Sequence, residues 1–226
     1  MGLRRADYLI VSCEHGGNRV PSAFKTLFSE KFLASHRGYD AGALALARDL
    51  AAAARAPLFY STTSRLLVEL NRPLGHPQIF HRPFPERTRA ALLRRYYFPY
   101  WNSIEAAIAR AIRRGRRVLH VSIHSFTPRF RGEQRTTDIG LLFDPRRRLE
   151  AAFCRRWKAR IGGLVVDENE PYAGVHPSVV QSMRERFSAR RYVGVQIEVN
   201  QKFPRGGAAR WRTLRANLVA SLMHLQ

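Results

Sequence analysis

The chain has 226 residues, 45% of them hydrophobic, and a formal net charge of +22. A chain of this length is expected to fold as one globular domain, residues 1–226, with a sizeable core. Its two cysteines, Cys13 and Cys154, are too few for a disulfide framework and lack CxxC spacing, which excludes a cysteine-rich zinc site.

No segment approaches the roughly 18 apolar residues that a membrane helix requires. The apolar run after Arg4 and Arg5 is far shorter than a secretory core, and no small-residue cleavage site follows it. We therefore expect a soluble, cytoplasmic protein without a membrane partner.

The positive charge is compatible with a nucleic-acid partner, an anionic surface or an acidic substrate. Its arginine clusters, such as 113–117 and 184–191, fall mostly on predicted helices, where a solvated face is the simpler explanation. No helix-turn-helix, RNP-like or zinc-finger pattern accompanies them. An acidic substrate is therefore favoured over nucleic acid.

The first predicted strand delivers polar residues into a glycine turn. Leu9 to Cys13 form a short apolar run, and Gly16-Gly17 ends it because glycine supplies backbone freedom that a strand does not use. Glu14 and His15 therefore lie at the carboxyl end of the strand. In open α/β sheets this end is where ligands bind.

The next elements are a short helix with a loop over Pro21–His36 and a helix over Ala41–Arg55. Asp40 stands at the N-cap position of the second helix, and capping is its simplest role. Strands are predicted at Pro57–Tyr60 and Arg65–Leu70. The second of these is followed by Asn71 and Arg72.

An irregular loop over Gly75–Pro85 precedes a long helix over Thr88–Arg114, which Pro99 is expected to interrupt. The stretch Val118–Ser125 then alternates as a strand does, with His120, Ser122 and His124 on one face and His124 at the strand end. We expect His120, and also His76 and His81 in the loop, to be structural.

The rest of the chain continues the alternation of strands and helices. A charged loop over 130–137 is followed by strands at 138–143, 164–166 and 192–199 and by helices at 149–161, 179–189 and 211–225, with Glu198 near the end of the last strand. The pattern predicts an α/β fold, a three-layer sandwich in which helices cover both faces of a mostly parallel sheet.

Four predicted strands thus bring His15, Asn71 with Arg72, His124 and Glu198 to one edge of the sheet. Two imidazoles and an oxygen ligand suit Zn²⁺ or another divalent metal, and catalytic sites keep one position open for water. A carboxylate that does not bind the metal can accept a proton, and an arginine fork can hold a substrate carboxylate. Hydrolysis of an amide that bears an acid group would use all of these.

Seven segments, taken in order, resemble the N-formylglutamate amidohydrolase family: CEHGGNRVP, YDAGA, SRLLVELNRP, HVSIHSFTP, DIGLLFD, NEPYAG and VQIEVNQ. They cover nearly the whole chain. The family is distantly similar to the zinc carboxypeptidases and to aspartoacylase-like deacylases. The resemblance implies a twisted sheet of the phosphorylase/hydrolase type and a zinc-dependent enzyme that converts N-formylglutamate, or a close analogue, to formate and glutamate.

The resemblance also implies roles for single residues. His15 and His124 resemble the metal histidines, and Glu198 resembles the general base. The Asn71-Arg72 pair is similar to one that holds a substrate carboxylate, and Arg65 is a further substrate contact.

The third metal ligand departs from the carboxypeptidase pattern, which has a glutamate three residues after the first histidine. Asn18 occupies that position here. The candidates are Asp40, Glu14 and Asn18 itself, and we favour Asp40 because a carboxylate binds zinc better than an amide does.

Two other functions remain open at this point. The basic surface could bind nucleic acid or another polyanion beside a vestigial pocket. Alternatively, the hydrolase site could act on a different acyl group, as a deacylase or a peptidase.

Overall fold

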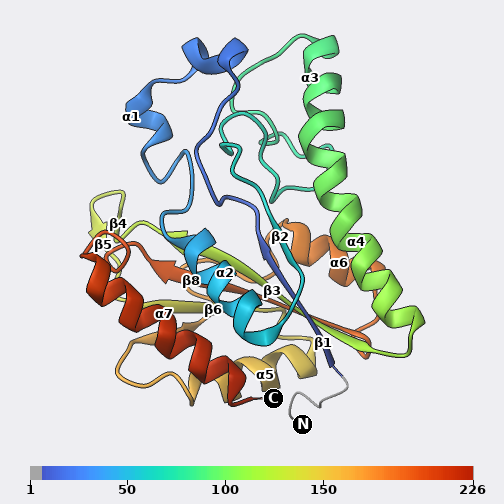
Figure 1. Ribbon diagram of the computed structural model, residues 1–226, viewed down its shortest axis with the longest axis vertical. Helices are drawn as coiled ribbons and strands as arrows, with labels where there is room; N and C mark the ends of the chain where they lie inside the picture. The colour runs from blue at the N-terminus through green and yellow to red at the C-terminus, as the bar shows by residue number, and fades with distance from the viewer. Residues whose placement is uncertain (1–6, 226) are drawn as a thin grey trace.

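A six-stranded sheet in the order β2-β1-β3-β8-β6-β7 forms the centre of the computed structural model, which describes residues 7–225 (Figure 1). Its strands are β1 (Asp7–Cys13), β2 (Leu58–Tyr60), β3 (Arg117–Phe126), β6 (Ile139–Leu142), β7 (Val166–Glu168) and β8 (Tyr192–Asn200). The four strands from β2 to β8 are parallel, whereas β6 runs antiparallel to β8 and parallel to β7. The predicted mostly parallel sheet is confirmed.

Helices cover both faces of this sheet, as predicted. On one face lie α2 (Ala43–Ala54), α5 (Arg148–Lys158) and α7 (Ala208–Met223), and on the other lie α4 (Phe98–Arg113) and α6 (Val179–Arg186) (Figure 1). Each strand contributes side chains to the core on both faces of the sheet, because successive side chains point to opposite faces. On β1, for example, Leu9 and Val11 pack in the core beneath α2, and Ile10 packs in the core beneath α4.

The predicted helix over Thr88–Arg114 is divided differently from the expectation. It comprises α3 (Glu86–Leu92), a π-helical turn over Leu93–Tyr97, and α4. Pro99 lies in the first turn of α4, where its missing N–H is tolerated, and the wider turn directly precedes it.

Arg4 and Arg5 lie outside the described residues.

The predicted strand at Arg65–Leu70 is wrong. Leu66, Leu67, Val68 and Leu70 are all buried, so the run does not alternate between core and solvent. It forms turns instead, in which the backbone N–H of Leu67 donates to the carbonyl of Ser64 and that of Leu66 to the Ser64 hydroxyl. Asn71 and Arg72 therefore do not follow a strand.

Smaller elements complete the fold. The segment Pro21–His36 holds a 3₁₀ helix, Ser22–Leu27, and α1 (Glu30–Leu33). The predicted charged loop over 130–137 instead contains a small hairpin of β4 (Arg129–Phe130) and β5 (Glu133–Gln134). Between residues 7 and 225, no helix is both long and apolar enough to cross a bilayer.

His120, Ser122 and His124 share one face of β3, as the alternation predicts. His120 is fully buried there, with its Nε2 2.8 Å from the Ser12 hydroxyl and its Nδ1 2.8 Å from the Tyr192 hydroxyl. Both ring nitrogens are therefore satisfied within the core, which accords with a structural role. Burial lowers the pKa of His120 to about 4 from its ordinary 6.5, although Glu14 opposes the shift.

We expect His120→Gln to lose less stability at pH 5 than at pH 7. The unfolded chain takes up a proton on this histidine below about pH 6.5, whereas the folded chain does so only near pH 4. The contribution of His120 to the stability of the folded protein is therefore full above pH 6.5 and is lost on acidification. The loss measured by urea unfolding should shrink by about 2 kcal/mol between the two pH values. The control is His224→Gln at an exposed position. An equal loss at both pH values would show that His120 does not stay neutral in the core.

Candidate functional site

A cavity of about 210 Å³ lies at the carboxyl ends of the central strands. It is lined by all seven site residues that the sequence predicts: His15, Asp40, Arg65, Asn71, Arg72, His124 and Glu198. His15 follows β1, and His124 on β3 pairs directly with Glu198 on the neighbouring β8. The strand-end argument therefore places these three residues correctly.

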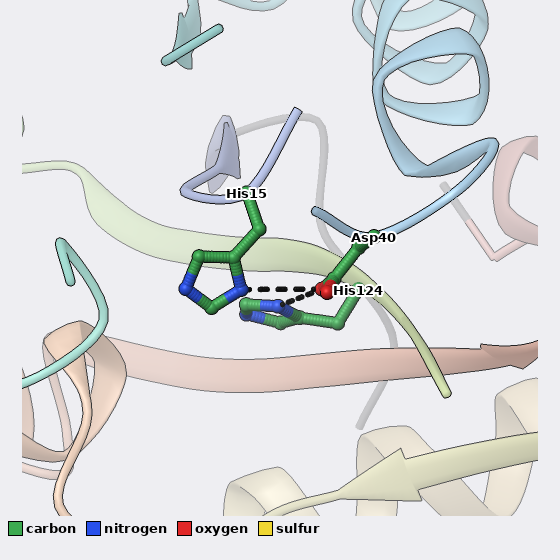
Figure 2. Close-up of side chains that lie close together, drawn as sticks. All are labelled: His15, Asp40 and His124. Atoms are coloured by element: carbon green, nitrogen blue, oxygen red, sulfur yellow. Dashed lines mark hydrogen bonds and ion pairs between the residues drawn. The ribbon is translucent and has the colours of Figure 1, made fainter. Parts of the chain in front are cut away.

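Two histidines converge on a single oxygen of Asp40. The Nδ1 atoms of His15 and His124 lie 3.2 and 2.9 Å from its Oδ2 (Figure 2). All three residues are buried, and their ligand atoms lie close enough together to hold one metal ion. The expected capping role of Asp40 is wrong, because Gly42 occupies the N-cap of α2 and the Asp40 carboxylate points toward the histidines.

The outer nitrogen of each histidine faces another carboxylate. The Nε2 of His15 lies 2.5 Å from Glu69 Oε1, and the Nε2 of His124 lies 3.1 Å from Glu14 Oε2. A ring that donates its Nε2–H to such a carboxylate turns the lone pair of its Nδ1 toward the centre of the site. Carboxylates behind metal-binding histidines have this orienting effect in general.

The charges of the site also suit a cation. Burial opposes ionisation of Asp40, but His15 and His124 hold the pKa of its carboxyl far below the usual range. Burial and Arg65 lower the pKa of His15, and burial lowers that of His124, yet the neighbouring carboxylates outweigh them and raise both pKa values. The buried anions are thus balanced either by protons on both rings or by one divalent ion bound between them. The donor set fits a divalent metal that accepts nitrogen and oxygen ligands.

Glu198 is a buried carboxylate beside this cluster. Its Oε2 makes no hydrogen bond within the described part of the chain. Burial raises the pKa of Glu198 to about 7, with Asp40 adding to the rise while His124 and Arg65 oppose it. A carboxylate with a pKa near neutrality can both accept and return a proton.

The other two candidates for a third ligand lie elsewhere. Glu14 sits behind His124 and accepts hydrogen bonds from the Tyr100 hydroxyl at 2.8 Å and the Ser122 hydroxyl at 2.7 Å. Asn18 does not line the cavity. Asp40 is the carboxylate that reaches both rings on their inner side.

The three predicted substrate-binding residues already bond to other residues of the chain, but to different extents. Arg65 forms ion pairs with Glu69 at 2.5 Å and with Asp40 at 3.4 Å. Arg72 donates from Nη1 to the carbonyl of Pro177 at 2.6 Å. Asn71 accepts from the backbone N–H of Val179 at 3.1 Å, and its Nδ2 lies 3.3 Å from Nε2 of His124.

Sequence reasoning missed Glu69. It lies inside the run RLLVEL, whose pattern predicts a strand, and only the turns of this segment aim its carboxylate at His15. The available signal was an acidic residue four positions after Arg65 in an otherwise apolar run. Tyr172 and Gln196 were missed as well, although both line the cavity.

Comparison with known proteins decides the family. The profile of the N-formylglutamate amidohydrolases matches residues 8–203. The chain belongs to the N-formylglutamate amidohydrolase family. The resemblance read from the seven sequence segments is therefore confirmed, and membership of an amidohydrolase family supports a hydrolase.

Solved structures share the fold. A gene product of Agrobacterium tumefaciens is 28% identical, with a TM-score of 0.83 over 96% of this chain and 89% of that chain. The N-formylglutamate amidohydrolase from Ralstonia eutropha is 19% identical, with a TM-score of 0.71 over 99% of this chain and 94% of that chain. A search of the curated proteins found no match.

We expect Tyr100→Phe to destabilise this family member by about 1–3 kcal/mol, because it leaves the buried Glu14 Oε1 without its donor. Urea unfolding at pH 7 measures the loss. Tyr96→Phe on the preceding helical turn is the matched control, since its hydroxyl bonds to no residue within 7–225. Equal effects of the two changes would show that the Glu14 hydrogen bond contributes nothing.

Proposed function

We propose that this protein is a metal-dependent amidohydrolase that cleaves the amide of an N-acylated acidic amino acid, N-formylglutamate or a close analogue. The observation that carries the proposal is the convergence of His15, Asp40 and His124 beside the buried carboxylate of Glu198 in one cavity. The reaction class is supported by the family profile and by the relative described as an N-formylglutamate amidohydrolase.

The cavity suits a small anionic substrate. Its volume of about 210 Å³ lies below the usual range of pockets for drug-sized ligands. Arg65, Asn71 and Arg72 line it, which gives the cavity two cationic residues and one amide residue. Because Arg65 already pairs with two carboxylates, Arg72 is the better candidate of the two for a planar contact with a substrate carboxylate.

His15, Asp40 and His124 would hold the metal, Zn²⁺ or another divalent ion, with Glu69 and Glu14 orienting the two rings from behind. When bound there, the ion supplies a Lewis acid that polarises the acyl oxygen and acidifies water. Asp40 keeps its negative charge in the site, which offsets part of the positive charge of the ion.

Glu198 carries the proton in this mechanism. Its carboxylate accepts a proton from water as the water oxygen bonds to the acyl carbon. The same carboxyl then returns the proton to the amide nitrogen as the carbon–nitrogen bond breaks, which releases a carboxylic acid and an amine. For N-formylglutamate the products are formate and glutamate. A pKa near 7 suits both steps at neutral pH.

We expect the purified wild type to contain about one zinc or other divalent ion per chain, and His15→Ala and His124→Ala to lose both metal and activity, because each removes one of three ligands. Elemental analysis and N-formylglutamate hydrolysis on the same samples measure this. His224→Ala, at an exposed position, is the control. If the wild type bound no divalent ion under any loading condition, the metal-dependent mechanism would be wrong.

We expect Glu198→Gln to keep its metal but to lower the rate by roughly 10²-fold or more, the scale of a lost general base. Metal content and kcat are compared with those of the wild type. Loss of metal from Glu198→Gln would instead make Glu198 a ligand.

A further inference from the structure

We propose that Arg135 binds a second carboxylate of the substrate and makes the enzyme selective for dicarboxylic N-acyl amino acids. This inference rests on the proposed function and adds to it a specificity-determining residue outside the predicted site. It is carried by the position of the Arg135 guanidinium, which lies against three aromatic rings of the cavity wall.

Arg135 directly follows the β4–β5 hairpin. Its guanidinium carbon lies 5.5 Å from the ring centre of Phe126, 4.8 Å from that of Phe130 and 5.2 Å from that of Tyr172. All three of these residues line the cavity. Stacking on these rings fixes the guanidinium beside the cavity, so an anion that reaches it from the cavity would not have to order a mobile side chain.

The hydrogen-bonding capacity of Arg135 is only partly used. Its Nη1 donates to the carbonyl of Thr127 at 3.4 Å and to the hydroxyl of Tyr172 at 3.2 Å. Within residues 7–225 no carboxylate pairs with it, in contrast to Arg65, which is held by two. A guanidinium has five N–H donors in a planar fork that matches a carboxylate. Arg135 therefore retains donors for an incoming anion.

The electrostatic surroundings favour an anion at this wall. His36 also lines the cavity, and burial lowers the pKa of its imidazole, as do the nearby charges of Arg37, Arg205, Arg65 and Arg135. The charges of these four arginines all act on His36 and therefore add to one another at this side of the cavity. A substrate with two negative charges gains more from this field than a substrate with one.

Tyr172 links Arg135 to the reacting centre. Tyr172 and Glu198 both line the cavity, and the Glu198 charge adds to the rise that burial causes in the pKa of the Tyr172 hydroxyl. The loop that carries Tyr172 comes close because Gly140 has no side chain: a Cβ there would lie 1.9 Å from the Glu170 carbonyl oxygen and 3.3 Å from Glu198 Cβ. Arg135 thus contacts a residue that lines the same cavity as the proposed base.

The test compares kcat/KM for N-formylglutamate, N-formylglutamine and the α-amide of N-formylglutamate. We expect the wild type to prefer N-formylglutamate over at least one amide, and Arg135→Met to lower its kcat/KM by roughly 10- to 100-fold, chiefly through KM, the scale of a hydrogen bond between charged groups. Activity on the disfavoured amide should change less than about threefold, and Arg135→Lys should recover part of the preference. In Arg135→Met, kcat/KM for one of the two amides should approach kcat/KM for N-formylglutamate. The carboxylate that this amide lacks is the one that Arg135 binds.

Arg129→Met is the matched control, because Arg129 is an exposed arginine of the adjacent hairpin and its guanidinium stacks on none of the three rings that hold Arg135. It should leave all three kcat/KM values unchanged. Equal losses on all three substrates in Arg135→Met would give Arg135 a merely structural role and overturn the inference, while the hydrolase proposal would stand.

If the wild type hydrolyses none of the three compounds, the proposed function fails on its own. Calorimetric binding of N-formylglutamate and its two amides to wild type and Arg135→Met then tests the inference separately. A preference for the dicarboxylate that disappears in the variant supports the role of Arg135. Equal binding of all three compounds by the wild type, or no binding at all, overturns it.

Discussion

The carboxylate of Asp40 is the constraint on which the site depends. One of its oxygens faces Nδ1 of both His15 and His124, and its other oxygen faces Arg65. It therefore joins the end of β1, the segment before α2, the turns at 64–72 and the end of β3. A buried carboxylate is costly unless it is paired. The surrounding cationic groups meet that cost, and the same arrangement leaves a place for a divalent ion.

The fold supports this cluster with a buried polar layer on one side of the sheet. Ser12, His120 and Ser122 lie on the strand faces beneath α4, where Tyr100 reaches down to Glu14. Since almost every polar atom in this layer has a partner, the histidines are held by hydrogen bonds as well as by packing. The unbonded oxygen of Glu198 is an exception, and it lies where a proton acceptor is needed.

The arginines in and beside the cavity have different partners, and we infer different roles for them. Arg65 forms ion pairs with Glu69 and Asp40 and stabilises the anions of the site, whereas Arg135 packs on aromatic rings and pairs with no carboxylate among residues 7–225. Part of the high positive charge of the chain is therefore gathered around the cavity. Pairing determines which of these cations stabilises the protein and which remains open to a ligand.

Local patterns in the sequence determined the strands and the faces they present. Period-two alternation placed His124 on the correct face of β3, the glycines after His15 ended β1, and the ordered segments indicated the family and the roles implied for Glu198 and Arg72. Only the tertiary structure decided what depends on contacts between distant residues. The segment 65–70 folds as turns, and its four apolar residues are all buried. Glu69 reaches a histidine 54 positions away, and Asp40 meets His124 across 84 positions. The period of a segment encodes its secondary structure, but packing between segments decides which side chains meet.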